Sequence, residues 1–309
     1  MDLATYAVRR LLLMIPMILG ATLIVFIAMY LLPGDVVDMM LADAAASAED
    51  IEMLREQLGL NDPFLVQYGR FLSGAVRGDF GISLSSRRQV MRMILGQLPA
   101  TLRLGMAAFI LSIISGVTMG VIAGVRRGSW VDTATMGIAL AGVSIPVFWT
   151  GLMMIFIFSL RLGWFPSGGS DSIRTLIMPA VALSMGSMGL LARLTRSSML
   201  EVMGSDYIRT ARSKGLSERV VTVKHALRNA MIPIVTIAGL ALGRMMGGTV
   251  LTEVVFSRQG VGYLAARAVQ TSDFPVVQGT VTVLVVGFLV ANLIVDLTYG
   301  ILDPRIRYE

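Results

Sequence analysis

Residues 205–216 read Ser-Asp-Tyr-Ile-Arg-Thr-Ala-Arg-Ser-Lys-Gly-Leu, a short polar stretch in a mostly apolar chain. Ser205 is a favourable N-cap, and Asp206 suits the positive end of a helix dipole. Gly215 is a favourable terminator, because glycine readily adopts the left-handed backbone conformation that often ends a helix. These residues predict a short helix over 206–214 that stops at a glycine.

A second helix is predicted to follow the first. Ser217-Glu218 can begin it, and Pro233 marks the next boundary. The whole segment 193–233 contains eight basic and three acidic residues, so its net charge is +5 of the chain's formal +6. The pattern predicts a rigid helix–glycine–helix hairpin to which a soluble protein could bind.

The composition places this hairpin in a membrane protein. The chain has 309 residues, of which 55% are hydrophobic and 15% are charged, and its mean hydropathy is +0.75. A soluble domain has roughly 45–50% apolar and about 25% charged residues. An apolar, basic chain favours a membrane protein over a disordered chain, a soluble enzyme or a nucleic-acid binder.

The residues that usually carry chemistry are scarce. Cysteine is absent and His225 is the one histidine, so disulfides are excluded and zinc or iron–sulfur ligands are missing. No Gly-Lys-Ser/Thr phosphate loop occurs, so another chain must hydrolyse any ATP that is used. We therefore expect no catalytic residues, metal or cofactor in this chain.

Six apolar runs are long enough to cross a bilayer, which takes about 20 residues in a helix. They cover residues 11–32, 104–125, 134–160, 173–192, 234–256 and 276–302. Pro146 interrupts the third run and Pro179 lies in the fourth, and spans tolerate proline when neighbouring helices satisfy the freed backbone groups. We predict an all-α membrane protein with six transmembrane helices in a single domain, 1–309.

The basic residues predict the orientation. If the N-terminus is inside, the inner segments hold 14 Lys and Arg, against four in the short outer segments. Because cytoplasmic loops carry the excess of Lys and Arg, we expect both termini and segment 193–233 to be cytoplasmic.

The long outer loop, 33–100, is predicted to be helical rather than disordered. Residues 47–50 form a capping-box pattern before an amphipathic stretch that Gly59 closes. A turn at 61–63 leads into a second amphipathic stretch over 64–76. This helical cap covers the ends of the spans or docks an outer partner.

Two sets of glycines recur every four residues within spans. They are Gly116, Gly120 and Gly124 in the second span, and Gly239, Gly243 and Gly247 in the fifth. Such stripes let a neighbouring backbone approach closely. They predict either static packing or an interface that slides during transport.

Three residues of the fifth span, Arg244, Met245 and Glu253, are candidates for a translocation path. A charged residue at the centre of a span is costly, so Arg244 should face protein or water. Arg244 could attract a substrate carboxylate, or it could pair with Glu253 or Asp296. Met245 could line the same path or serve as adaptable packing.

The hairpin sequence resembles a known family. Segment 206–216, followed by His-Ala-Leu-Arg-Asn-Ala-Met-Ile-Pro at 225–233, is similar to the coupling loop of ABC importer permeases of the dipeptide/oligopeptide/nickel/glutathione class. The general permease motif is Glu-Ala-Ala, three residues, Gly, nine residues, Ile-x-Leu-Pro. Here 209–211 reads Arg-Thr-Ala and Gly215 matches, while His225 and Arg228 replace the Ile and the Pro, as is typical of the peptide class.

The resemblance extends along nearly the whole chain. The matching stretches, which are specific in their order and spacing, are Arg9-Arg-Leu, Leu32-Pro-Gly-Asp, Gln57-Leu-Gly-Leu, Gly78-Asp-Phe-Gly, Leu98-Pro-Ala-Thr, Arg127-Gly-Ser-Trp, Leu162-Gly-Trp, Asp273-Phe-Pro-Val-Val-Gln and Asp303-Pro-Arg-Ile-Arg.

The resemblance implies the type I ABC importer permease fold in a bacterial inner membrane. It implies a second homologous permease, two ATPase subunits of one or two kinds that bind ATP and Mg, and an outer substrate-binding protein. The short helix 206–214 would be the coupling helix that docks in an ATPase. The docking residues would be Asp206, Tyr207, Arg209, Thr210, Ala211, Arg212, Lys214, Gly215, Leu216, His225 and Arg228.

Two other function classes remain as alternatives at this point. A stand-alone, ion-coupled secondary transporter would use Asp296 and Arg244 as coupling charges. An intramembrane enzyme would need a nucleophile–base set, which the sequence does not offer. The substrate is open among dipeptide, oligopeptide, glutathione, opine and nickel chelate, and so is pairing with itself or with a relative.

Overall fold

The computed structural model describes residues 3–31, 61–302 and, between them, 49, 52, 53, 55, 56 and 59. The side chains of 3–6, 244, 296 and 298–302 lie outside this description. The described part is helical apart from turns and one isolated β-bridge between Ile82 and Gln89. The all-α prediction is confirmed.

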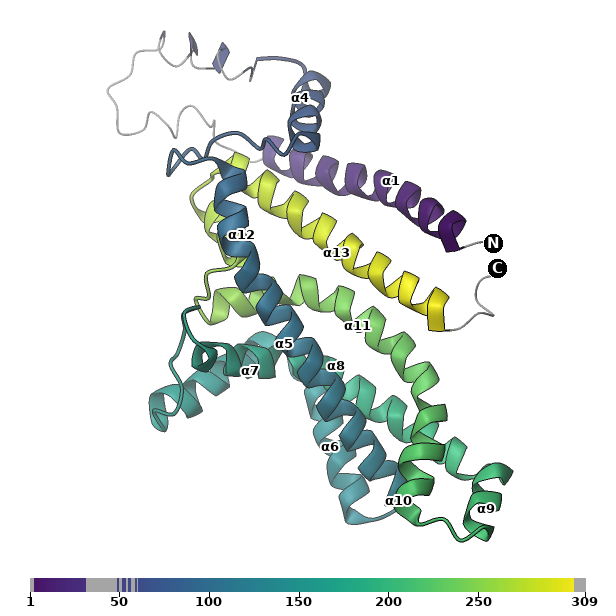
Figure 1. Cartoon of the computed structure of the whole chain (residues 1–309). Coiled ribbons are helices and arrows are strands. Elements are labelled where there is room, and N and C mark those ends of the chain that lie inside the picture. The colour runs from purple at the N-terminus through teal and green to yellow at the C-terminus, as the bar shows by residue number, and fades with distance from the viewer. Residues whose placement is uncertain are drawn as a thin grey trace.

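The helices follow one another in a simple order (Figure 1). Their bounds are α1 (Leu3–Tyr30), α4 (Phe64–Val76), α5 (Val90–Val125), α6 (Trp130–Ser144), α7 (Val147–Met154), the π-helix η1 (Ile155–Arg161), α8 (Ile173–Met203), α9 (Asp206–Ser213), α10 (Glu218–Val220), the π-helix η2 (Val221–Leu227), α11 (Arg228–Val255), α12 (Val261–Gln270) and α13 (Phe274–Leu302).

Within the residues that the structure describes, five helices are long and apolar enough to cross a membrane, and a bent pair makes a sixth candidate. In the bent pair, α6 and α7–η1 meet at 107°, so the predicted third span is not one straight helix. The break follows from Pro146, which lacks a backbone N–H and forces the residue before it out of the helical region. Ile145 is accordingly extended, with φ −84° and ψ 126°.

Two other predicted boundaries differ from the structure. Pro233 lies inside α11 instead of ending a helix, because a continuous helix runs from Glu218 into the apolar segment. The apolar stretch long enough to span is therefore Glu218–Gly243, which begins well before the predicted 234–256. In α8, the predicted span 173–192 continues to Met203 and carries the hairpin away from the apolar core.

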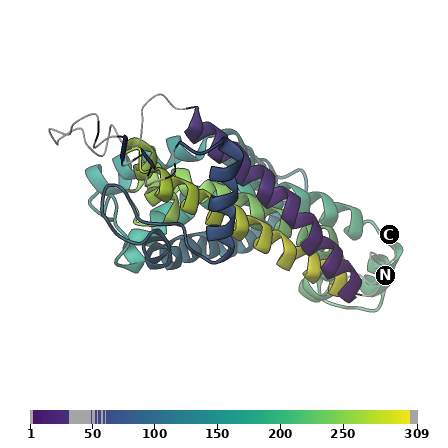
Figure 2. The ribbon, with the colours of Figure 1, turned by 90° about the horizontal axis from the view of Figure 1, so that it is seen from above.

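The long helices have two distinct ends. The start of α1, the end of α13 and the α9 hairpin lie toward one end, and α4 and α12 lie toward the other (Figure 1). Figure 2 shows the same separation from above, with α1 running beside α13. The structure thus brings the start of α1 and the end of α13 to the side of the molecule that carries the hairpin.

At the α4 end, aromatic side chains join the cap to the first span. Phe26 of α1 lies 5.3 Å from Phe64 and 5.5 Å from Tyr68 of α4, between ring centroids. The Tyr68 hydroxyl also donates to the Leu19 carbonyl at 2.9 Å. The predicted helix at 64–76 is confirmed as α4, whereas most of the earlier amphipathic stretch lies outside the described residues.

The first glycine stripe lies directly against α8. A Cβ at Gly120 would lie 2.4 Å from Thr195 Cβ and 2.6 Å from the Ala192 carbonyl oxygen. A Cβ at Gly116 would lie 2.8 Å from the Met188 carbonyl oxygen. The glycines therefore let two helix backbones approach more closely than any other residue would permit.

The second glycine set does not form such a stripe. Gly243 faces the Asn292 side chain of α13, but a Cβ at Gly247 would meet nothing described within 4 Å. Gly248 instead of Gly247 comes close to Leu183. Among the described residues of this chain, the seam predicted through Gly239, Gly243 and Gly247 therefore has no packing neighbour at Gly247.

We predict that Gly120→Ala destabilises the protein, because its Cβ would overlap α8. Overpacking of this kind costs about 1–3 kcal/mol. Thermal unfolding of the purified chain in detergent should show a lower midpoint. Gly96→Ala in the same helix is the matched control, since its Cβ would meet no neighbour within 4 Å. Equal midpoints for the two variants would contradict the packing argument.

Candidate functional site

The short helix α9 begins where the sequence predicts. Ser205 takes the N-cap position with extended backbone, φ −76° and ψ 152°. Its hydroxyl, however, donates to the Val202 carbonyl at 2.6 Å and does not cap α9. Asp206 lies in the first turn, where a negative charge stabilises the helix dipole.

Gly215 ends the helix as predicted. Its φ of +77° lies in the left-handed region, which favours glycine. The Gly215 N–H donates to the Arg212 carbonyl at 2.9 Å, and the Leu216 N–H donates to the Ala211 carbonyl at 3.4 Å. These bonds satisfy the last carbonyls of α9 and reverse the chain into α10.

Apolar contacts seat α9 on the rest of the molecule. Ile208 is fully buried and Ala211 nearly so. They form a cluster with Met199 of α8 and with three residues that follow the turn, Val221, Ala226 and Ala230. The hairpin therefore has a defined position against α8 and α11.

The opposite face of the hairpin is polar and open to solvent. Arg209 and Asp206, with side chains 82% and 90% exposed, pair with each other at 2.8 Å. Arg212 pairs with Glu218 across the turn at 2.8 Å. Exposed pairs of this kind contribute little to stability, so these charges are available to a partner.

The predicted docking residues divide into two groups. Those exposed on the hairpin are Asp206, Tyr207, Arg209, Thr210, Arg212, Lys214, Gly215, Leu216 and Arg228. His225 is half-buried, and Ala211 faces the core. The prediction that Ala211 contacts a docking partner is therefore corrected. Its methyl group faces inward and packs in the buried cluster that holds α9 in place.

Met245, one of the predicted translocation residues, is buried inside the described part of the molecule. Met245 is 3% exposed and packs in a cluster with Leu104, Ala108, Ala180 and Leu183, so it serves as packing here. The side chains of Arg244 and Asp296 lie outside the described part of the chain.

Glu253 is buried in a polar junction rather than lining a path. Its carboxylate accepts hydrogen bonds from the Thr101 hydroxyl at 2.7 Å and the Tyr263 N–H at 3.0 Å. The Thr101 hydroxyl oxygen in turn accepts from the Val261 N–H at 2.8 Å. Glu253 thus ties the first turn of α12 to α5, and the path role predicted for it is not supported.

Asp273, the residue before α13, forms a second polar junction. Its carboxylate accepts four hydrogen bonds, from the hydroxyls of Ser83 and Ser85 and from the N–H groups of Leu84 and Ser85, at 2.6–3.2 Å. Burial raises the pKa of the Asp273 carboxyl, but the hydrogen bonds outweigh it and the net pKa is lowered. Asp273 anchors the loop before α5 in its ionised form.

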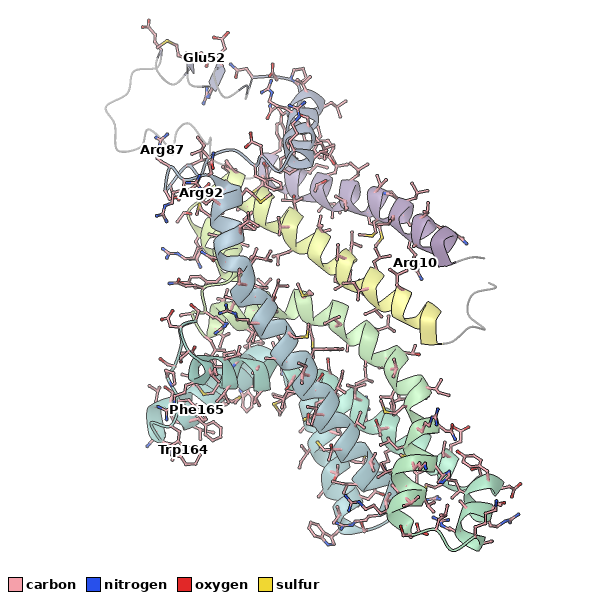
Figure 3. All side chains as sticks on the ribbon, viewed as in Figure 1. Arg10, Glu52, Arg87, Arg92, Trp164 and Phe165 are labelled. Carbon is pink, nitrogen blue, oxygen red and sulfur yellow. The ribbon has the colours of Figure 1, made fainter. Side chains whose placement is uncertain are left out.

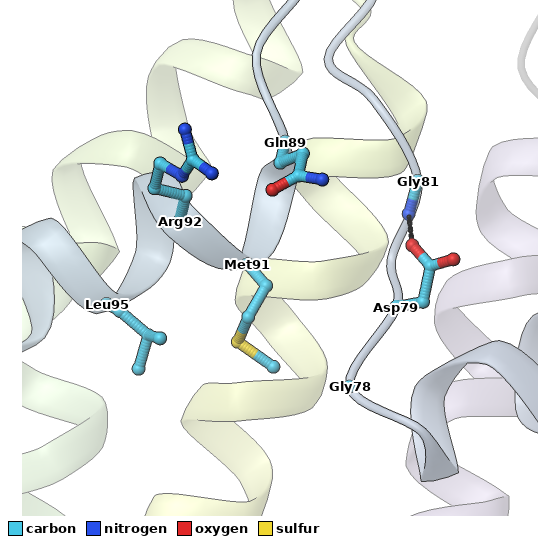
Figure 4. A pocket seen from close by; sticks show the side chains of 7 residues that line it. All are labelled: Gly78, Asp79, Gly81, Gln89, Met91, Arg92 and Leu95. Atoms are coloured by element: carbon cyan, nitrogen blue, oxygen red, sulfur yellow. Dashed lines mark hydrogen bonds between the residues drawn. The ribbon is translucent and has the colours of Figure 1, made fainter.

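An open hollow of about 410 Å³ lies beside this loop (Figure 4). Gly78, Asp79, Gly81, Gln89, Met91, Arg92 and Leu95 line it. Figure 3 shows Arg92 and Arg87 near the start of α5, at the opposite end of that helix from the α9 hairpin. Within the described residues no group of three or more His, Asp or Glu could hold a metal ion.

A third junction, between Asp132 and Arg196, was missed by the sequence reasoning. Arg196 Nε and Nη2 donate to Asp132 Oδ1 and Oδ2 at 2.6 and 2.7 Å. These residues are far apart in the sequence, on α6 and α8. The sequence does contain one indication of this junction: Asp132 is an acidic residue in the first helical turn, which begins at the end of the Arg127-Gly-Ser-Trp stretch.

Comparison with known proteins gives two family matches. The binding-protein-dependent transport system inner membrane component matches residues 116–308. The N-terminal membrane component of binding-protein-dependent transport systems matches residues 3–107. The two matches together cover nearly the whole chain.

Full-length relatives point in the same direction. The dipeptide transport system permease protein DppB of Alkalihalophilus pseudofirmus is 42% identical, over 98% of this chain and 99% of the relative. The glutathione transport system permease protein GsiC of Escherichia coli (strain K12) is 41% identical over the same shares.

Two solved structures share the fold. The MetNI methionine ABC transporter in an inward-facing conformation aligns with a TM-score of 0.58 and 21% identity, over 69% of this chain and 97% of that chain. An amino acid ABC transporter with histidines aligns with a TM-score of 0.51 and 15% identity, over 69% of this chain and 94% of that chain.

We predict that Asp273→Asn loosens the loop before α5. An amide presents a donor where the carboxylate accepts four, and removing a charged partner costs about 1–3 kcal/mol. Trypsin should then cleave faster after the exposed Arg87 and Arg88. Asp79→Asn is the control, because exposed Asp79 accepts one loop hydrogen bond, from the Gly81 N–H. Equal cleavage rates in wild type and Asp273→Asn would refute the anchor.

The same anchor predicts a pH dependence. Because the pKa of folded Asp273 is lowered, its stabilisation is present above the ordinary aspartate value of 3.8 and is lost as the pH falls through the folded pKa. The gap between the unfolding midpoints of wild type and Asp273→Asn should therefore narrow below pH 3.8. A gap that widens there would contradict this assignment.

Proposed function

The chain belongs to the family of inner-membrane components of binding-protein-dependent transport systems, and we propose that the solute it moves is a short peptide or a peptide-like molecule. It is a multi-pass inner-membrane permease of an ABC importer, with the fold of such permeases. The named substrates of two relatives, a dipeptide and glutathione, support the peptide class. Both substrates are short chains with amide bonds and free carboxylates.

The observation that carries the mechanism is the α9 hairpin. Ile208 and Ala211 fix α9 to α8 and α11, while its exposed face offers charged groups held in a defined geometry. Such a hairpin fits a groove in a soluble ATPase subunit. ATP binding would move the ATPases, and α9 would pass that motion to the spans, so that the path opens to each side in turn.

The partners follow from this mechanism. This permease pairs with a second, related permease, and two ATPase subunits dock beneath them. The ATPases bind ATP and Mg, so this chain itself performs no covalent chemistry. An outer binding protein delivers the solute and supplies much of the selectivity.

The orientation follows as well. The basic excess of segment 193–233 supports a cytoplasmic hairpin. The start of α1 and the end of α13 lie toward the same end as α9 (Figure 1), which supports cytoplasmic termini.

Whether uptake is driven by ATP or by a proton gradient tests the proposal. Proteoliposomes containing both permeases and both ATPases should take up radiolabelled dipeptide when the binding protein and ATP are supplied. The chain alone, under a proton gradient, should take up none. Gradient-driven uptake by the chain alone would instead identify a secondary transporter.

We predict that Gly215→Val impairs ATP-coupled uptake while membrane insertion is retained. Valine at φ +77° strains the turn by roughly 1–2 kcal/mol and so displaces α9 from its seat. Uptake and ATPase co-purification measure the effect. Gly204→Val is the control in the same hairpin, because Gly204 has φ −84° and its Cβ would make ordinary contacts. Wild-type coupling in Gly215→Val would count against the hairpin as the ATPase seat.

A further inference from the structure

The Asp132–Arg196 pair is well defined and largely enclosed. Asp132 is 4% exposed, and the Arg196 side chain is 29% exposed. Besides the two bonds from the guanidinium, Asp132 Oδ2 accepts a bond from the Gly128 N–H at 3.0 Å. Two parallel N–H···O bonds fix both the distance and the angle between the partners.

The pair connects the hairpin seat to α6. Arg196 lies on α8 one turn before Met199, which belongs to the same buried cluster as Ile208 of α9. Asp132 lies in the first turn of α6. The ion pair therefore joins the beginning of α6 to the part of α8 that holds α9.

Close backbone contacts continue this connection along the helices. A Cβ at Gly124 of α5 would lie 2.8 Å from Met199 Cβ. Cβ atoms at Gly142 of α6 and Gly189 of α8 would lie 2.8 and 2.2 Å from the carbonyl oxygens of Met185 and Ala139. Helices α5, α6 and α8 therefore pack closely along their length. The ion pair adds a polar connection between α6 and α8 at the end nearest the hairpin.

We propose that Asp132 and Arg196 are positioning residues for coupling: their ion pair makes α9, α8 and the start of α6 move as one body. The proposal rests on the proposed function of α9 as the ATPase seat. With the pair intact, a displacement of α9 reaches α6 and, beyond the bend, α7. Without it, α8 follows α9 while the start of α6 lags, and ATP is hydrolysed with less solute moved.

The ratio of solute transported to ATP hydrolysed tests this role in the reconstituted importer. Arg196→Gln should lower the ratio about fivefold or more, the range of a typical coupling energy. Arg196→Lys should fall between wild type and Arg196→Gln, because lysine keeps the charge but loses the bidentate fork. Arg193→Gln is the matched control, since Arg193 is an exposed arginine one turn earlier on α8.

This ratio separates positioning from mere support of the fold. A variant that only folds less well reduces transport and hydrolysis together and leaves the ratio unchanged. A wild-type ratio in Arg196→Gln, with assembled complexes, would overturn the proposal. Loss of ATP-dependent uptake in the wild-type importer would instead overturn the proposed function.

Distances measured by spin labels test the rigid body directly. The chain has no cysteine, so labels can be placed at cysteines introduced for Thr133 on α6 and Ser213 on α9, both exposed. In an otherwise wild-type importer, the label distance should stay the same in nucleotide-free and ATP-trapped states. Adding Arg196→Gln should make it differ between states. A distance that already changes with the native pair would refute the proposal, even if Arg196→Gln fails to insert.

Discussion

The close approach of α8 to its neighbours is the constraint on which the rest of the structure depends. Lipid tails are as apolar as the side chains, so helices in a bilayer associate through van der Waals contact and hydrogen bonds rather than through hydrophobic burial. Gly120 of α5 and Gly189 of α8 remove the side chains that would hold the backbones apart. Because α8 also carries the α9 hairpin at its end, the most buried of the candidate spans in the described part of the chain is the one that would receive the force of an ATPase.

The buried carboxylates whose side chains the structure describes lie at or next to helix ends. Asp132 begins α6, Glu253 is near the end of α11, and Asp273 precedes α13. Each accepts several hydrogen bonds, which offset the cost of taking a carboxyl group out of water. Directional bonds thus fix where helices begin and end, while non-directional packing fixes how their middles meet.

The sequence predicts those features that depend on local patterns. Apolar length predicts the spans, and Gly215 and the stretch 64–76 predict the turn and helix that the structure has. A proline in the sequence indicates where a helix can break, but not whether it does, because that depends on the packing of neighbouring helices. The chain bends by 107° at Pro146, whereas Pro233 lies inside α11. The bonds from Ser83 to Asp273 and from Arg196 to Asp132 join residues far apart in the chain, and a single sequence does not show which distant partner each acid will meet.

The two joints at the hairpin end differ in kind, and the difference bears on how force passes through them. Apolar contacts around Ile208 hold α9 on α8, and such contacts act through close packing rather than through a preferred bond direction. The bidentate bonds between Arg196 and Asp132 lose energy steeply with the same rotation, because they depend on angle as well as distance. The two joints act in series: close packing keeps α9 seated on α8, and the bidentate pair keeps α8 in register with α6, so a displacement of α9 reaches the start of α6.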